Sequence, residues 1–446
     1  MTILATPCPV SLGPLAEPRW ALCFTALRTL TLGVALLSPL AWSHAACAAE
    51  PPSEPTSSHQ PLAHEPTATA ALPSEPTSAT VAPDPAFSRH PTERRYGFGA
   101  LPIPNFTSDF GMGLGLVGSL FHFSDGYRPY HWDLDAGIYV TTGGIRVYGL
   151  LSDFPHLLGS EWRLNTMVAY NRNLGAAFYG IGNQGRATPG QSARYNYYDL
   201  EDPTIRVYFR RPIWRSLLFY IGLRLTKDVV NYDANSLVAA MHPYGIAGGN
   251  YNQINAGFAW DSRDNEHNPG SGTLLEVSGR TAAPWLGSAY QTYSVYLSAS
   301  WYHTLMPRLI LATRVAFDRQ WGDVPFTHLD DIGGLYPASG LGGGNTLRGA
   351  LSDQFIGKVK ALGNIEGRYR LVEFQIRNRP LEFDVVGFYD VGRVWASDGG
   401  DGPTWNIHQG VGGGLRMIWD HVFVIRADSG FADGGYRVYI DAWQAF

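Results

Sequence analysis

The sequence predicts an all-β protein, a transmembrane antiparallel β-barrel that occupies residues 97–446. Composition is the first reason: only 16% of the 446 residues are charged, 13% are aromatic and 51 are glycine, whereas a soluble domain carries roughly a quarter of charged residues. Apolar and polar residues also alternate with period two in many segments. Beyond residue 48, no apolar run reaches the roughly 20 residues that a transmembrane helix needs. A membrane protein that crosses with strands is therefore expected.

The N-terminal 48 residues have the pattern of a secretory signal peptide. An apolar stretch at 21–42 is followed by small residues at 43–49, with cleavage expected after Ala48 or, alternatively, after Ala45. A lipoprotein anchored through Cys47 is a further alternative. The chain has three cysteines, all in this region, so the mature barrel has neither a disulfide framework nor a thiolate metal site. They are Cys8, Cys23 and Cys47.

Residues 49–96 are rich in Pro, Ser, Thr, Ala and Glu, and the hexapeptide at 52–57 is repeated at 73–78. Such a segment cannot bury enough apolar surface to offset the entropy of ordering it. We expect a disordered periplasmic linker.

From residue 97 onward, segments such as 293–301, 309–318 and 364–371 place an apolar face opposite a polar one. A soluble sandwich could show the same alternation, but two features favour a membrane barrel. Aromatic residues gather at strand ends and turns, as in interfacial girdles, and the chain ends in an alternating strand, 438–446, with a terminal Phe446. An open sheet edge is not tolerated in lipid, so this last strand is expected to close on the first. About 350 residues at ~22 per strand and connection give about 16 strands. The aromatic residues are Tyr195, Tyr197, Tyr198, Trp214, Phe219 and Tyr220.

Four short motifs follow one another along the chain. The first is a glycine motif at 179–183, and the second is a turn with an Asp-x-Arg-Asp…Pro-x-x-Gly pattern. The third is the glycine-rich segment 343–349, which ends in Arg-Gly, and the fourth is the strand motif 388–392. The turn residues are Asp261, Arg263, Asp264, Pro269 and Gly272. In this order the four motifs resemble those of the BamA/TamA (bacterial surface antigen) superfamily of outer-membrane barrels, in which the third is similar to the tip of a long loop that folds into the lumen.

The resemblance implies that the loop at about 325–350 folds inward and is held there by a latch. Alternation places Phe388 and Asp390 on one strand face and Glu366 on the polar face of the preceding strand, where Arg348 could reach both carboxylates. Gly349 and Gly392 complete the two motifs. The alternative is that Arg348 is a solvated loop residue. The family usually has an aromatic residue after Arg-Gly, where this chain has Ala350.

Other chemistries are not indicated. The net charge of −5 disfavours nucleic acid as a partner. A G-x-G-x-x-G match at 113–118 lies in a strand with no helix after it, and no G-x-S-x-G is present. The pairs Asp330–Asp331 and Asp261/Asp264 lie in turn-like sequence, where Asp bonds to the backbone. We expect no metal, no cofactor and no enzyme activity.

For function, the resemblance implies translocation or insertion of protein or lipid at the bacterial outer membrane. A passive or gated pore is the alternative, and a surface-exposed structural or adhesive barrel is the second alternative, disfavoured because most connections look short. The expected partners are the lipid bilayer, unfolded protein or lipid clients, and the assembly machinery that inserts the barrel itself. Family members that assemble or export proteins carry POTRA domains before the barrel, and the segment 49–96 is too short for one.

Overall fold

The computed structural model describes residues 96–446, except 125–129, 193, 336, 377–378, 398–405, 422 and 434. The predicted signal peptide (1–48) and nearly all of the predicted linker lie outside the described residues. The predicted barrel start, Gly97, is the second residue of the first strand.

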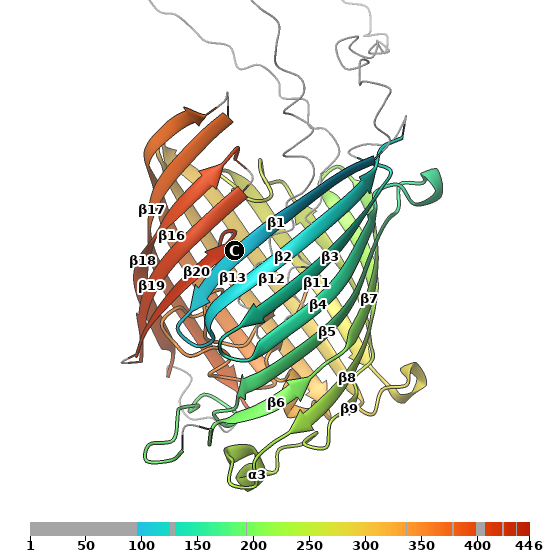
Figure 1. The fold of residues 1–446 in the computed structure, drawn as a ribbon, viewed down its shortest axis with the longest axis vertical. Helices are drawn as coiled ribbons and strands as arrows, with labels where there is room; N and C mark the ends of the chain where they lie inside the picture. Colours follow the sequence, from blue (N-terminus) through green and yellow to red (C-terminus); the bar gives the residue numbers. More distant parts are fainter. Residues whose placement is uncertain are drawn as a thin grey trace, which may run out of the picture.

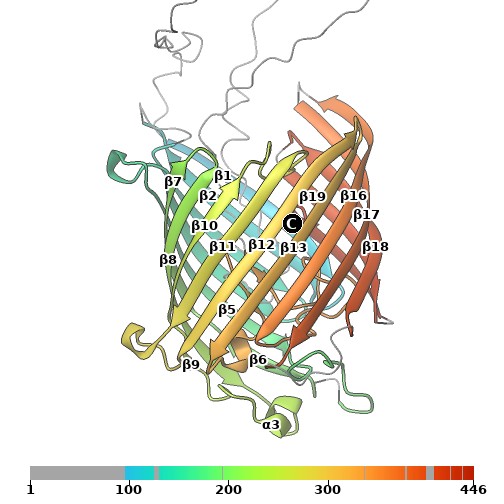
Figure 2. The same cartoon turned by 180° about the vertical axis from the view of Figure 1, so that it is seen from behind.

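The described chain forms a closed antiparallel barrel of 16 strands, as predicted (Figures 1 and 2). Each wall strand pairs with its neighbours in chain order. The strands β6 and β9 extend the wall, and β14 and β15 form a separate small sheet. No helix in the described part of the chain is long and apolar enough to cross a membrane. The strands and helices are β1 (Tyr96–Thr107), β2 (Gly111–His122), β3 (Trp132–Thr141), β4 (Ile145–Phe154), η3 (Leu157–Gly159), β5 (Arg163–Ala177), β6 (Tyr197–Glu201), β7 (Thr204–Trp214), β8 (Leu217–Asn231), α3 (Leu237–Met241), β9 (Gly249–Asn250), β10 (Gln253–Asp261), β11 (Gly272–Ala282), η4 (Pro284–Leu286), β12 (Thr292–Met306), β13 (Leu309–Gly322), η5 (Phe326–His328), β14 (Asp331–Ile332), β15 (Ala338–Ser339), β16 (Val359–Ile376), β17 (Arg379–Trp395), β18 (His408–Trp419), β19 (Phe423–Ala432) and β20 (Gly435–Ala442).

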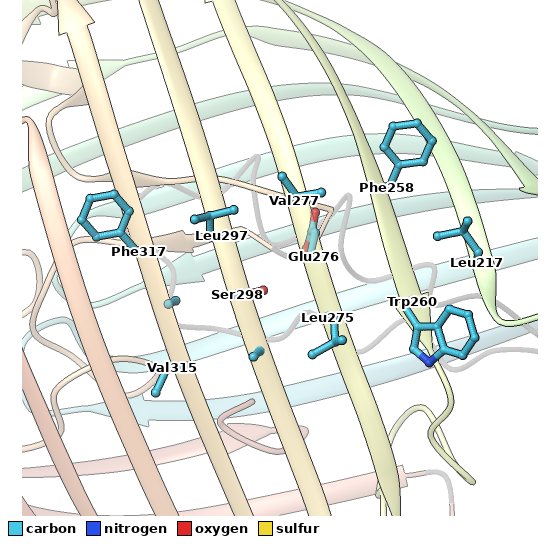
Figure 3. A pocket seen from close by; sticks show the side chains of 12 residues that line it. Leu217, Phe258, Trp260, Leu275, Glu276, Val277, Leu297, Ser298, Val315 and Phe317 are labelled. Carbon is cyan, nitrogen blue, oxygen red and sulfur yellow. The ribbon is translucent and has the colours of Figure 1, made fainter.

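The predicted alternation sets the two faces of the wall. In β12 and β13, Leu297 and Phe317 point outward and are exposed, whereas Ser300 and Asp318 point inward and are buried. The outer wall over β8 and β10–β13 is hollowed by a shallow depression of about 440 Å³. Figure 3 shows that apolar side chains from neighbouring strands surround it. The exterior is therefore a lipid-type surface and the interior a polar one.

The aromatic residues predicted to form girdles divide between the two faces. Trp214 is 58% exposed, as an interfacial residue would be, but Tyr198 and Tyr220 are buried inside. The hydroxyl of Tyr220 donates to Glu276 at 2.5 Å. These two tyrosines lie on inward positions of their strands and face the lumen. The prediction that they belong to an interfacial girdle was wrong.

The connections differ between the two ends of the barrel. At the end opposite Tyr96, three are long, namely 178–203, 232–252 and 323–358. They carry β6, the helix α3 and the strands β14 and β15. The expectation of mostly short connections does not hold at this end.

The longest of these connections, 323–358, folds into the lumen and is called the plug here. Its apolar residues pack in two buried clusters. One contains Leu341, Leu347 and Phe355 against wall residues such as Val394, and the other contains Phe326. The predicted inward-folded loop is therefore present.

The barrel closes through a short seam between β1 and β20, which lie side by side in Figure 1. Two residue pairs of the strands join them, Phe106 with Ile440 and Thr107 with Tyr439, and the amide of Ser108, just after β1, donates to the Val438 carbonyl at 3.1 Å. By contrast, β1 pairs with β2 along its entire length. The predicted closing strand 438–446 is corrected here: β20 ends at Ala442, and Trp443 has a left-handed φ of 71°. Residues 443–446 form no strand pairing with β1.

Candidate functional site

The tip of the plug places Arg348 against both carboxylates named from the sequence. Its Nε and a terminal nitrogen donate to Asp390 at 2.7 and 2.8 Å, and the other terminal nitrogen donates to Glu366 at 2.5 Å. The guanidinium carbon lies 3.5 Å from the centre of the Phe388 ring. Arg348 is only 1% exposed. Bidentate pairing of this kind fixes direction as well as charge.

The register of β16 and β17 explains this arrangement. Glu366 lies opposite Phe388, and Asn364 lies opposite Asp390, so all four side chains share the inward face. The inward side chain of Asn364 donates to Asp390 at 2.8 Å. Gly392 continues the row, and a Cβ there would lie 2.3 Å from a methyl group of Leu341 in the plug. The strand motif 388–392 therefore contributes the Asp390 carboxylate and the Phe388 ring, and the absence of a side chain at Gly392 leaves room for Leu341 of the plug.

The wall adds charged residues that the sequence motifs did not indicate. Arg368 and Arg416 lie 2.8 and 3.7 Å from Glu366. Asp428 lies 3.4 Å from Arg348 and 2.5 Å from Arg416. We call the eight connected side chains the latch network; its members are Arg348, Arg368, Arg416, Arg426, Glu366, Asp390, Asp428 and Asp441.

All eight members are at most 3% exposed. Four are cations and four are anions, so the network is formally neutral, which is the condition under which buried charges are tolerated. Alternation along β18–β20 could have placed Arg416, Asp428 and Asp441 inside. However, no local motif connects them with the plug.

Backbone groups of the tip are held as well. The carbonyl of Asn345 accepts from Arg314 at 2.5 Å, and that of Thr346 accepts from Asn364 at 2.6 Å. The Tyr439 hydroxyl accepts from the amide of Gly349 at 3.1 Å and donates to the carbonyl of Ala350 at 3.2 Å. Ala350, the departure from the family pattern, is itself buried in the plug cluster. The tip therefore contacts β13, β16 and β20 in addition to the latch network.

A second anchor holds the beginning of the plug. His328, fully buried, lies between Asp228 and Asp331, with nitrogen–oxygen distances of 3.0 and 2.8 Å. Its ring lies 3.6 Å from the Tyr251 ring. Lys360 reaches the carbonyls of Leu329 and Gly357. The predicted Asp330–Asp331 pair thus belongs to hydrogen-bonded loop structure.

The predicted turn motif forms a compact connection between β10 and β11. Arg263 donates to both oxygens of Asp261, at 2.9 and 2.7 Å. Asp264 accepts from the amide of Gly270 at 3.0 Å. Gly272 has φ of 104°, and a Cβ there would lie 2.3 Å from the Ser262 carbonyl oxygen. Pro269 is buried in the same turn.

This turn contacts the C-terminal segment. The Gln444 side chain donates to Asn268 at 2.8 Å, and the Trp443 ring lies 5.4 Å from that of His267. Burial, and then the Arg263 guanidinium, lower the pKa of His267 to about 3. The ring therefore packs in its neutral form. Trp443 also lies edge-on to Phe423, with ring centres 5.8 Å apart.

Phe446 lies beside two arginines of the wall. Its ring lies 4.9 Å from the guanidinium of Arg314 and 5.7 Å from that of Arg368. Arg368 also donates to the Phe446 carbonyl at 3.4 Å. The same two arginines hold Asn345 of the plug and Glu366 of the latch network. The C-terminus is thus connected to the plug through shared wall residues.

Within the described residues, no group of three or more His, Cys, Asp or Glu side chains is placed to hold a metal ion. The depression of Figure 3 is lined by apolar residues on the outer wall, with few polar groups. Many of the charged residues of the interior form ion pairs with one another.

Comparison with known proteins assigns the sequence family. Residues 136–433 match the model of the Omp85 superfamily domain. No curated protein matches the sequence.

Solved structures show the same fold. BamA from Haemophilus ducreyi lacking POTRA domains 1–3 is 14% identical with a TM-score of 0.54, over 77% of this chain and 69% of that one. CdiB from Escherichia coli is 14% identical with a TM-score of 0.51, over 78% of this chain and 63% of that one. The chain thus spans less than two thirds of the length of CdiB.

Proposed function

Since this chain belongs to the Omp85 superfamily of bacterial outer-membrane β-barrels, we propose that it translocates or inserts protein or lipid at the outer membrane through the seam between β1 and β20. The Tyr96 end then faces the periplasm, where the linker 49–96 would lie, and the long connections face outward. Neighbours such as BamA share the fold only, so the proposal depends on the geometry of this chain.

The observation that carries the proposal is the weakness of the seam. Two residue pairs join β1 to β20, while eight join β19 to β20 and twelve join β1 to β2. Backbone pairing is the main force that holds a barrel wall in lipid. The wall is therefore expected to open first at this seam.

The alternatives receive less support. A passive pore needs an open lumen, and here the plug is fixed across it by the latch network. An adhesive barrel is compatible with the three long connections, but it gives no reason for a seam of two pairs. We further propose that the chain acts on protein or lipid clients, that its linker 49–96 lies in the periplasm, and that assembly machinery inserts the barrel itself.

Sealing the seam is the test. Phe106→Cys with Ile440→Cys joins directly opposite residues, whose Cα atoms in such a pair are about 5.5 Å apart, within disulfide range. The matched control, Leu297→Cys with Phe317→Cys, cross-links an outward pair in the fully paired wall of β12 and β13. No native cysteine follows Cys47 to compete.

We expect oxidised cells that carry the sealed seam to show the outer-membrane protein and lipid inventory of a strain lacking the gene. Reduction should restore the parental inventory, and the control should resemble the parent throughout. A sealed variant that keeps the parental inventory while fully oxidised would contradict the proposal.

A further inference from the structure

Two prolines lie on the seam edge of β1, at positions 102 and 104. The amide of Ser108 donates to the Val438 carbonyl at 3.1 Å, and Phe106 is directly opposite Ile440. Backbone groups of a strand alternate in direction, so the even-numbered residues of β1 direct their backbone toward β20. Proline has no amide hydrogen to donate. Pro102 and Pro104 therefore remove two successive donors from this edge.

Continuation of the seam register shows the effect. If β20 extended beyond Ala442 in the same register, Ala442 would face Pro104 and Gln444 would face Pro102. Both would lack a donor for their carbonyl oxygens, which costs several kcal/mol per group in lipid. Pairing does stop at Phe106. On its other side the chain continues the β19 register for one more residue, where the amide of Trp443 donates to Val424 at 2.8 Å. Any other strand laid against this edge meets the same missing donors.

Apolar side chains line both faces of β1 along this unpaired stretch. On the outer face, Phe98 is 90% exposed and both prolines are exposed. On the inner face, Ile103 packs with Trp443 and Val117 in a buried apolar cluster, to which Leu101 adds. The polar exception is Asn105 at the end of the stretch, whose side chain donates to the Ile440 carbonyl at 2.5 Å. The seam is therefore a place where apolar surface continues from the exterior to the interior.

From these observations we propose that the unpaired stretch of β1, residues 100–105, together with Trp443, receives a lipid acyl chain and does not template a polypeptide strand. An acyl chain needs apolar contact and no hydrogen-bond donor from the edge. The carbonyls that remain on the edge can accept from water or from hydroxyl and ammonium groups of a lipid. This inference rests on the proposed function and narrows its client to lipid.

The test exposes the full chain, reconstituted in vesicles of phosphatidylethanolamine and phosphatidylglycerol, to two probes, one for a lipid acyl chain and one for a polypeptide strand. One probe is a phosphatidylcholine with a photoactivatable acyl chain. The other is a synthetic peptide of residues 437–446, which begins within β20 and runs to the C-terminus, with a photoactivatable label. Mass spectrometry maps the adducts. Val295 and Leu297 of β12, which face outward in a closed wall, give the background of ordinary lipid contact.

We expect the lipid probe to label the inward-facing Ile103 and Trp443, and the peptide to label neither. The double variant Pro102→Thr, Pro104→Val restores both donors, so lipid labelling of these two residues should be lost and peptide labelling should be gained. Pro212→Val, which changes a proline of β7 away from the seam, should behave like the parent.

Peptide adducts on residues 100–105 of the parent, or no lipid adducts on Ile103 and Trp443, would overturn the inference. The two proposals fail separately. If sealing the seam changes the membrane inventory but the peptide labels β1, the proposed function stands and the lipid inference falls. If sealing the seam leaves the membrane inventory unchanged but lipid labels Ile103, the proposed function falls and the lipid contact at β1 stands.

Discussion

Replacement of Arg348 with alanine is expected to lower the free energy of unfolding by about 3–5 kcal/mol, the usual effect of removing one partner from a buried ion pair. The guanidinium is 1% exposed and is the plug's direct link to Asp390, Glu366 and Asp428. Without it the network keeps four anions and three cations. Thermal unfolding in detergent micelles, followed by heat-modifiable gel migration, measures the loss, and planar-bilayer conductance should rise as the plug is released.

The matched control is Arg211→Ala, which removes an arginine from an exposed pair with Glu161. Such surface pairs contribute about 0–1 kcal/mol, so this variant should unfold like the parent. Equal stability and conductance of the Arg348 and Arg211 variants would mean that the latch network does not hold the plug.

A valine at Gly349 is expected to displace the tip of the plug altogether. Gly349 has φ of 101°, a backbone conformation that costs a β-branched residue about 1–3 kcal/mol. In addition, a Cβ would lie 2.5 Å from the Phe431 carbonyl carbon and 2.6 Å from the Ala432 amide nitrogen. These are backbone atoms of β19 and cannot rotate away. Limited proteolysis within 323–358 should become rapid, and conductance should rise.

Gly367→Ala is the control, because a Cβ at that position of β16 meets nothing within 4 Å. Its plug should resist proteolysis as the parent's does. If the Gly349 variant is equally resistant, the close approach of plug and wall is not required for the closed state.

The wall could be predicted from the sequence because its signal is local. Alternation along 293–301 depends only on which side chains meet lipid, and the structure confirms it. The group around Arg348 was accessible for a similar reason, since Glu366, Phe388 and Asp390 lie on inward positions of two adjacent strands. Asp428 was missed because its contact with the plug joins residues 80 positions apart.

The C-terminus shows why a local pattern can mislead. Residues 438–446 alternate as a strand should, yet only the part up to Ala442 is one. The local pattern does not include the opposite edge of β1, where two prolines have no amide hydrogen to donate. A strand needs a partner as well as a pattern, and partners are a property of the whole barrel. Tyr220 illustrates the same limit: its ring is as suitable for a membrane interface as for the buried hydrogen bond to Glu276 that it makes.

The enclosed plug imposes an order on assembly. Arg348 is bonded by residues of β16, β17 and β19, all of which follow it in the chain. A segment as long as 323–358, with a buried and charge-paired tip, would be difficult to thread into the lumen after the wall has closed. The C-terminal strands must therefore gather around the plug while the cylinder is still an open sheet. We therefore expect the joining of β1 to β20, the wall strands with the fewest residue pairs between them, to be the final step of assembly. In the proposed function, the joint that forms last during biogenesis is also the one that opens.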